Sequence, residues 1–191
     1  MSETQIQSKL DAVNRMLASI GETPVAVLSE ETGNADISLA TSLLEQTSRA
    51  VQGEGWDYNS DYNWDLVPDI NKQIVIPSNV LRVDPCDRTL DYVQRSGKLY
   101  DRSKRTFDFD DTVKADIIWL LPFEELPYQA REYIMIRSAR IFQDKTVGAT
   151  DLHGYDAQDE ARARADMESA DSSTNDTNAF AGEYGKELYR R

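Results

Sequence analysis

The sequence predicts an α+β fold: a discontinuous bundle of four helices, an inserted antiparallel β-sheet or small barrel, and an extended C-terminal arm. Three observations predict it. Apolar residues recur every three or four positions near both ends of the chain, as on one face of a helix. Between these regions, residues 56–121 are rich in Tyr, Trp, Val and Ile, in short runs separated by turn residues. After residue 171, Ser, Thr, Asn and Asp dominate, and no apolar period remains.

These changes in pattern define the predicted domains. The helical bundle comprises residues 1–55 and 122–171, which makes it discontinuous in sequence. The β-rich domain comprises residues 56–121, and the flexible C-terminal arm comprises residues 172–191.

The first predicted helix starts at an N-cap at Thr4 and ends near Ile20. Gly21 occupies the position where a left-handed C-cap is needed, and Pro24 prevents the helix from continuing. The apolar face of this helix consists of Ile6, Leu10, Val13, Leu17 and Ile20.

Three more helices follow from the same criteria. The second is predicted from an N-cap at Asp36 to Gln52, with Leu39, Ala40, Leu43, Ala50 and Val51 on its buried side. The third, Tyr128–Asp144, follows the turn PFEELP and is apolar over a wide face, so we expect it to be the most buried. The fourth, Ala157–Ala170, is polar, and Met167 is its one large apolar residue.

The β-rich domain contains six candidate strands. Asn71-Lys72 and Ser96-Gly97 are predicted turns, and the second joins two short runs as a hairpin. The last strand alternates between apolar and polar residues from Thr112 to Ile117, which indicates one buried face, and from Ile118 both of its faces are apolar. The predicted strands are Asn63–Val67, Gln73–Ile76, Val80–Asp84, Leu90–Arg95, Lys98–Asp101 and Thr112–Leu121.

The chain is acidic, with 34 Asp and Glu against 21 Lys and Arg and a net charge of −13. Such a surface repels phosphate, so wrapping of duplex DNA is not expected. Cys86 is the single cysteine and requires no oxidising compartment. The polar N-terminus and the lack of a long apolar run predict a soluble protein, made in a cytoplasm, that does not enter a membrane.

No catalytic, cofactor or metal motif stands out. His153, the one histidine, is predicted to lie in a polar loop without a nucleophile motif, and Cys86 has no signature around it. The acidic run Asp108–Asp111 lacks the glycine and terminal glutamate of a calcium loop. We therefore predict no catalytic residue, no cofactor and no metal. Basic residues concentrate between Arg88 and Arg105, which fits a local nucleic-acid patch. The interleaved Asp87, Asp91 and Asp101 favour ion pairing within a hairpin or a partner interface instead.

Several segments, in order, resemble the tail tubular protein A family, the adaptor or gatekeeper ring proteins of short-tailed bacteriophages (podoviruses). The family opens with a helix and turn similar to AVNRMLASIGETPV at Ala12–Val25. The later matching segments are GEGWDYN at Gly53–Asn59, LVPDI at Leu66–Ile70, KLYDR at Lys98–Arg102 and the helix entry at Leu126–Arg131. The resemblance covers about residues 10–170.

The resemblance implies a non-enzymatic virion protein that acts as a head–tail connector. Such proteins form a dodecameric ring between the portal protein and the tail nozzle, tail tubular protein B. The ring forms part of the DNA ejection channel and of the platform to which tail fibres attach. The helical bundle would lie toward the portal and the sheet domain toward the nozzle and fibres.

The arm is the predicted attachment segment. Phe180, Tyr184, Leu188 and Tyr189 are spaced through polar sequence and would anchor it on the portal or on a neighbouring subunit. Two other functions stay open at this point. One is a virion-associated glycan hydrolase that uses carboxylates such as Glu124 and Asp110. The other is a monomeric module that recruits a host protein.

Overall fold

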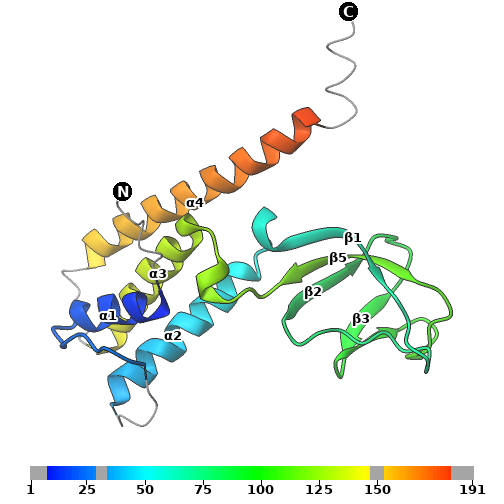
Figure 1. The fold of residues 1–191 in the computed structure, drawn as a ribbon, viewed down its shortest axis with the longest axis horizontal. Coiled ribbons are helices and arrows are strands. Elements are labelled where there is room, and N and C mark those ends of the chain that lie inside the picture. Colours follow the sequence, from blue (N-terminus) through cyan, green and yellow to red (C-terminus); the bar gives the residue numbers. More distant parts are fainter. Residues whose placement is uncertain (1–7, 29–33, 147–152, 182–191) are drawn as a thin grey trace, which may run out of the picture. The chain divides into compact units, whose positions relative to one another are not determined.

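The computed structural model describes residues 8–28, 34–146 and 153–181. It confirms the α+β class, with four α-helices and antiparallel sheets of three and two strands in these residues (Figure 1). The chain forms two compact units. The helical unit contains residues 1–51 and 122–191, and the β unit contains residues 52–121.

Helix α1 (Lys9–Ser19) is delimited by its capping residues. Ser8 forms a capping box with Asp11: its hydroxyl accepts from the Asp11 N–H, and its own N–H donates to the Asp11 carboxylate. The bonds that the Ser8 N–H and hydroxyl donate to the Asp11 carboxylate lower its pKa. The predicted cap at Thr4 lies outside the described residues, and the helix described here starts after Ser8.

The predicted corner at the end of α1 is confirmed. Gly21 has a φ of +83°, and its N–H donates to the Ala18 carbonyl. The Glu22 N–H donates to the Leu17 carbonyl, which completes a Schellman motif. Glycine is favoured here because a side chain in this conformation would be strained.

Helix α2 (Ala35–Gln52) and helix α3 (Tyr128–Thr146) lie close to their predicted bounds. Asn34, and not Asp36, satisfies the start of α2, since its side-chain oxygen accepts from the Asp36 N–H. Ala50, predicted to be buried, is exposed. A short 3₁₀ helix, Phe123–Glu125, precedes α3, whose buried residues include Tyr133, Ile134 and Phe142.

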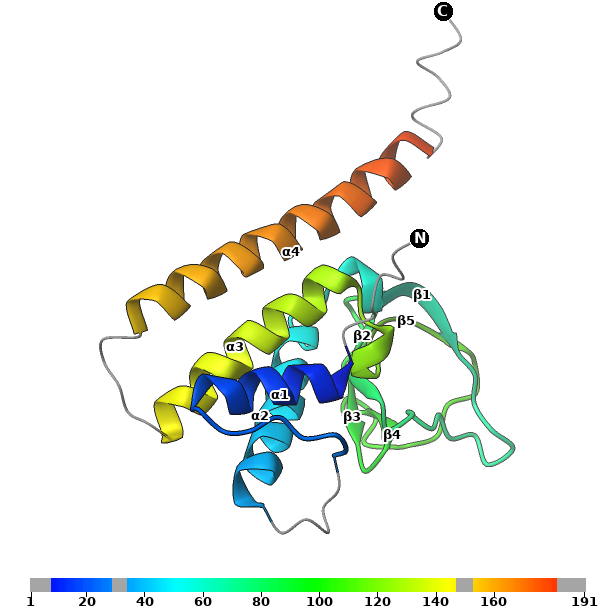
Figure 2. The same cartoon turned by 60° about the vertical axis from the view of Figure 1, so that its left-hand side comes forward.

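Helix α4 (His153–Ala181) is much longer than predicted. Residues 172–181, assigned to an extended arm from their composition, are helical in the structure. The chain has neither glycine nor proline between Gly154 and Gly182, so no strong helix breaker interrupts it. Figure 2 shows α4 running beside α3 and continuing past the end of it.

The β unit begins with a 3₁₀ turn (Asp57–Asn59) and has two sheets. In the first, β5 (Val113–Trp119) lies between β1 (Ser60–Leu66) and β2 (Val80–Pro85), antiparallel to both. In the second, β3 (Tyr92–Arg95) pairs with β4 (Lys98–Asp101) through the predicted Ser96-Gly97 turn, where both residues have positive φ.

One predicted strand is absent. Residues 73–76 form isolated bridges, from Gln73 to Asp108 and from Val75 to Lys98, instead of a regular strand. Their buried side chains, Ile74 and Ile76, still enter the core of the β unit. The apolar pattern therefore predicted burial correctly but not a continuous ladder. The other core residues are Leu66, Val80, Leu99, Phe109, Val113, Ala115 and Ile117.

Two buried carboxamides hold the chain where it enters and leaves the β unit. The Gln52 side chain donates to the Leu121 carbonyl (3.1 Å) and accepts from the Leu121 N–H (2.8 Å). Asn59 donates to the carbonyls of Gln52 (3.0 Å) and Trp119 (2.7 Å) and accepts from the Trp56 N–H. Buried backbone groups need such partners, so both side chains have a structural role.

Candidate interaction surfaces

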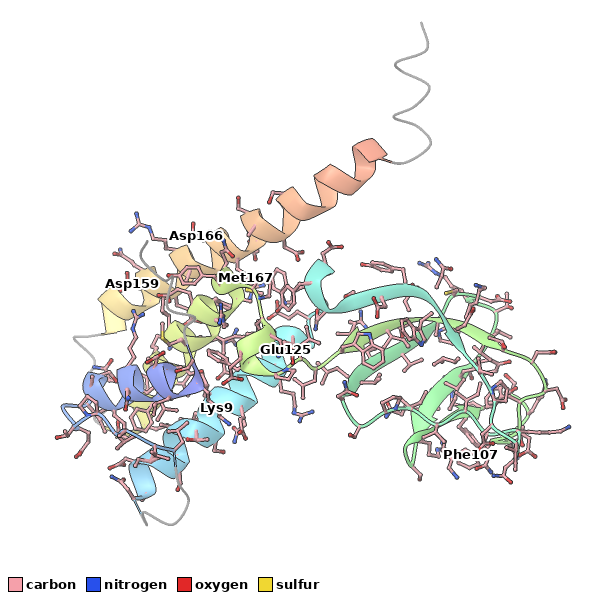
Figure 3. The ribbon with its side chains drawn as sticks, viewed as in Figure 1. Lys9, Phe107, Glu125, Asp159, Asp166 and Met167 are labelled. Carbon is pink, nitrogen blue, oxygen red and sulfur yellow. The ribbon has the colours of Figure 1, made fainter. Side chains whose placement is uncertain are left out.

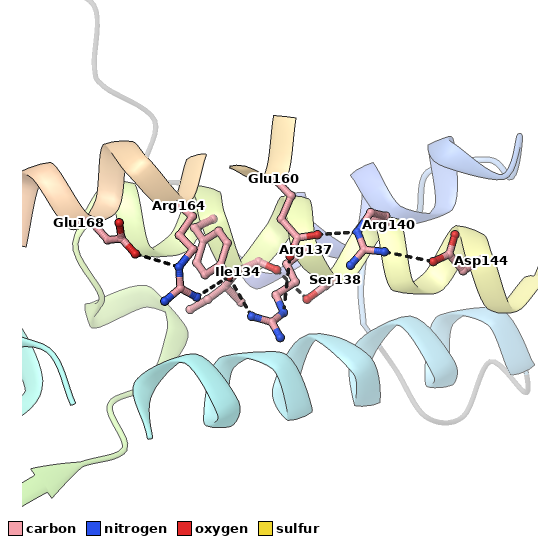
Figure 4. Close-up of polar contacts among 9 residues, drawn as sticks. Ile134, Arg137, Ser138, Arg140, Asp144, Glu160, Arg164 and Glu168 are labelled. Carbon is pink, nitrogen blue, oxygen red and sulfur yellow. Dashed lines mark hydrogen bonds and ion pairs between the residues drawn. The ribbon is translucent and has the colours of Figure 1, made fainter. Parts of the chain in front are cut away.

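The contact between α3 and α4 is mainly polar. Of the α4 side chains described, from 157 to 173, those of Ala163 and Met167 are buried. Glu160 on α4 accepts from Arg140 Nε on α3 and lies 3.8 Å from Arg137 Nε (Figure 4). Since so few apolar residues hold this helix, its ion pairs also contribute to its position.

Tyr133 forms the centre of this contact. Its side chain is 1% exposed, and its hydroxyl accepts from Arg137 Nη1 (2.8 Å) and Arg164 Nη1 (3.2 Å). Both guanidinium groups also lie near the face of its ring, 5.9 and 5.8 Å from the centroid. Arg164 is anchored further by Glu168 on its own helix.

Replacing Glu160 with glutamine should loosen α4. The change removes the carboxylate that two arginines of α3 share, at a cost of about 1–2 kcal/mol to helix docking. Amide exchange in α4 should then become about 5–30 times faster, as measured by hydrogen exchange with mass spectrometry.

The matched control is Glu168→Gln, because Glu168 pairs with Arg164 on its own helix and not with α3. It should change the exchange of α4 by less than about threefold. Equal effects of the two substitutions would contradict a special role of Glu160 in docking.

The register of these pairs shows how far α4 extends beyond α3. Arg140 faces Glu160, and Tyr133 faces Arg164, so the two helices run antiparallel. Continuing this register places the first residue of α3, Tyr128, opposite about residue 170 of α4. The last ten or so residues of α4 therefore run past α3, which Figures 1 and 2 both show.

The predicted anchor residues of the arm fall at and beyond this end. Phe180 lies in the last turn of α4, and nothing is described of its side chain. Tyr184, Leu188 and Tyr189 lie outside the described residues. The structure therefore locates the helix that leads to these residues but does not describe their contacts.

Acidic side chains line a shallow groove where α1, α3 and α4 meet. Asp159 and Asp166 project from α4 (Figure 3), and Arg162, which lies between them in the sequence, lines the same groove. Glu132 on α3 pairs with Arg15 on α1 across the same groove. The helical unit contains 21 acidic and 12 basic residues, which gives it most of the negative charge of the chain.

In the β unit, the basic residues between Arg88 and Arg105 largely form contacts within the unit. Arg102 pairs with Asp91, Lys98 donates to Gln73, and Lys104 lies 3.9 Å from Asp101. Arg95 stacks on Tyr100, with its guanidinium carbon 4.1 Å from the ring centroid. Arg102 and Lys104 thus form ion pairs within the unit, as one of the interpretations of this cluster predicts.

Large apolar residues are exposed mainly along one segment of the β unit. Of the eight such residues in the described chain, five lie between residues 62 and 75. Soluble proteins that expose apolar side chains together commonly use them to contact other proteins. The five residues are Tyr62, Trp64, Val67, Ile70 and Val75.

The carboxylates considered for catalysis belong to different units, and each is engaged in an ordinary contact within its own unit. Glu124 accepts from the Lys9 N–H in the helical unit, whereas Asp110 pairs with Lys72 in the β unit. Cys86 is exposed, and its thiol pKa is raised by desolvation and by the neighbouring Asp116 carboxylate. His153 does not lie in the predicted loop but is the first residue of α4. Across the described chain, no group of three or more potential ligands gathers to hold a metal, and no helix could span a bilayer.

Comparison with known proteins gives the class and then the family. The sequence is similar to structural proteins of bacteriophage tails, and residues 10–177 match the family described as tail tubular protein. The match spans most of the chain, so the protein belongs to the tail tubular protein family, and the predicted resemblance is confirmed.

A curated relative agrees with this assignment. Tail tubular protein A of Klebsiella phage KP34 is 29% identical over 158 residues, which cover 82% of this chain and 83% of the relative. The protein is thus a structural component of a phage tail, and its family favours a non-enzymatic role.

Proposed function

We propose that this protein is the tail adaptor that joins the portal to the tail nozzle. In this proposal, twelve copies form a ring that acts as a gatekeeper on the DNA ejection channel and helps to build the platform for tail fibres. Membership of the tail tubular protein family supports this function. The observation in the structure that carries it is the last part of α4, which extends beyond the helix it packs against.

The projecting end of α4 suits attachment to a larger neighbour. The last turns of α4 continue beyond the end of α3, and a polar helix end gains stability when another surface covers it. Phe180, Tyr184, Leu188 and Tyr189 follow at this end and would supply apolar anchors on the portal. The helical unit would then face the portal, and the β unit would face the nozzle, tail tubular protein B, and the fibres.

The acidic surface fits a channel through which DNA passes without specific binding. Carboxylates such as Asp159 and Asp166 on α4, or Asp108 and Asp111 in the β unit, would repel the phosphates of the moving duplex. A reconstruction of the assembled tail tests this assignment. A narrowest section lined by lysine and arginine side chains would contradict it.

The ring itself is tested by measuring mass with and without purified portal ring. With portal present, we expect a complex that contains twelve copies of the chain. A chain that stays monomeric under these conditions would overturn the adaptor function and would favour a free-standing binding module.

Two truncations test the attachment by α4. Removing residues 182–191 deletes three of the four proposed anchors, and removing residues 172–191 also deletes the projecting turns of the helix. Portal binding should weaken by at least about tenfold in the first variant and be lost in the second. Unchanged portal binding by the longer truncation would contradict attachment through α4, while α3 and the rest of α4 should remain folded.

A further inference from the structure

The groove where α1, α3 and α4 meet has room for side chains of another segment. Its volume is about 260 Å³, far more than the roughly 15 Å³ that one water molecule requires. Ile136 and Ala163 line it, together with Tyr128, which is 55% exposed although it belongs to the first turn of α3. An exposed ring beside such a hollow is suited to contact with further apolar side chains.

A carboxylate without a partner lies near this ring. Glu132 pairs with Arg15 across the groove, whereas the Asp166 carboxylate forms no ion pair or hydrogen bond within the described part of the chain. Since α3 and α4 run antiparallel, Tyr128 lies opposite about residue 170, within about four residues of Asp166. One end of the groove therefore offers an aromatic ring and a negative charge together.

Residues 182–191 contain groups that complement this end of the groove. The run LYRR at 188–191 places two apolar side chains directly before two arginines. Gly182 directly follows Ala181, the last residue of α4. Glycine at this position commonly ends a helix and lets the chain change direction. A reversal at Gly182 would direct the arm back along α4, toward the groove.

The lengths of helix and arm set how far the arm can reach. Measured back from Ala181 along the axis of α4, residue 170 is about 17 Å away and Asp166 about 23 Å away. Asp159 is about 33 Å away. If two residues form the reversal, the remaining eight residues of the arm extend over about 26 Å. The arm can therefore reach Asp166 but not Asp159.

The same lengths give the register of the contact. Leu188 and Tyr189 fall about 17 and 20 Å back along α4, which is the level of Tyr128. Arg190 falls about 23 Å back, which is the level of Asp166. Apolar side chains thus meet the exposed ring at the same register in which a cation meets the carboxylate that lacks a partner.

We propose that, in the free chain, residues 182–191 fold back along α4 and cover this end of the groove. Leu188 and Tyr189 pack on Tyr128, and the next two residues, both arginines, pair with Asp166. The contact covers apolar side chains that a free subunit would otherwise expose. Portal binding then draws the arm away from the groove. This release rests on the proposed function, whereas the contact in the free chain does not.

Cross-linking of the full-length free chain tests the contact. With Cys86→Ser, the substitution Gln129→Cys in the groove is combined with Glu187→Cys, and neither position belongs to the proposed pairing. The control combines Glu187→Cys with Ser172→Cys. Ser172 is exposed and, six residues from Asp166, points about 120° away from it around the helix.

The fold-back predicts which pair reacts faster. In dilute, oxidising solution, the groove pair should form its intramolecular disulfide at least about tenfold faster than the control pair, because docking raises the effective concentration of the two thiols. An undocked arm would favour the control, since Ser172 is closer to Glu187 along the chain. Equal rates, or a faster control, would overturn the contact.

Charge exchange tests the register. In the chain with the groove pair, Asp166→Lys should slow cross-linking at least about threefold, and adding Arg190→Glu with Arg191→Glu should restore most of the rate. Asp159→Lys is the matched control, because Asp159 lines the same groove beyond the reach of the arm. It should change the rate by less than about twofold. Equal slowing by both lysine substitutions would contradict the register.

Purified portal ring tests the release of the arm. Portal added before oxidation should slow cross-linking of the groove pair at least about tenfold. Cross-linking that persists in complete rings would contradict the release and leave the adaptor function intact. If no ring forms with portal while the free chain still cross-links, the adaptor function fails and the contact in the free chain stands.

Discussion

Replacing Asn59 with alanine should lower the free energy of unfolding of the β unit by roughly 3 kcal/mol or more. The side chain is 2% exposed and bonds three backbone groups, at Gln52, Trp56 and Trp119. Alanine would leave these groups with one partner fewer in a place that water does not reach, and each such loss costs about 1–3 kcal/mol. Urea unfolding followed by tryptophan fluorescence measures the change.

Asn79→Ala is the matched control for this substitution. Asn79 is exposed, and its backbone carbonyl, which alanine retains, accepts from the Leu120 N–H. Its removal should therefore alter the free energy of unfolding by less than about 0.5 kcal/mol. Similar losses from both substitutions would show that the buried bonds of Asn59 are not important.

The second large effect is expected from Met167→Ala in α4. Met167 is 2% exposed and is the one large apolar side chain buried on the described part of this helix. Truncating a buried methionine typically costs about 2–5 kcal/mol. Because Ala163 is the one other buried side chain on the described part of α4, most of this loss should appear as undocking of α4 rather than as global unfolding.

Hydrogen exchange distinguishes undocking of α4 from global unfolding. Amides of α4 should exchange at least about 30 times faster in Met167→Ala, while those in the middle of α2 should change little. Asp166→Ala, at the neighbouring exposed position, is the control and should leave both helices near their original rates. A uniform increase over the whole helical unit would contradict separate undocking of α4.

Features set by neighbours in the sequence could be predicted from it. Gly21 ends α1 and Ser96-Gly97 closes the hairpin, because positive φ angles favour a few residue types. The alternation along β5 predicted its buried face, since successive side chains of a strand point to opposite sides. The ordered motifs from Ala12 onward indicated the family that the comparisons then showed.

Other features depended on competition between local signals. The polar residues after Asp171 suggested an irregular arm, yet they continue α4 through Ala181, because extending an existing helix is much easier than starting one. Ile74 and Ile76 indicated a strand, but their segment makes only isolated bridges. Composition correctly indicated a polar segment after Asp171 and burial of Ile74 and Ile76, but it did not determine the backbone conformation of either segment.

The sequence by itself determined the α+β class, the helix and turn boundaries with local causes, the acidic character and the family of this protein. Only the tertiary structure decided which distant groups meet. Gln52 bonds to Leu121, Asn59 to Trp119, and Tyr133 to Arg164. The tertiary structure also decided that Arg102 pairs with Asp91, that Arg95 stacks on Tyr100, and that α4 extends beyond the end of α3. The physical reason is that propensity and periodicity act over a few residues, whereas hydrogen bonds and burial depend on which segments folding brings together.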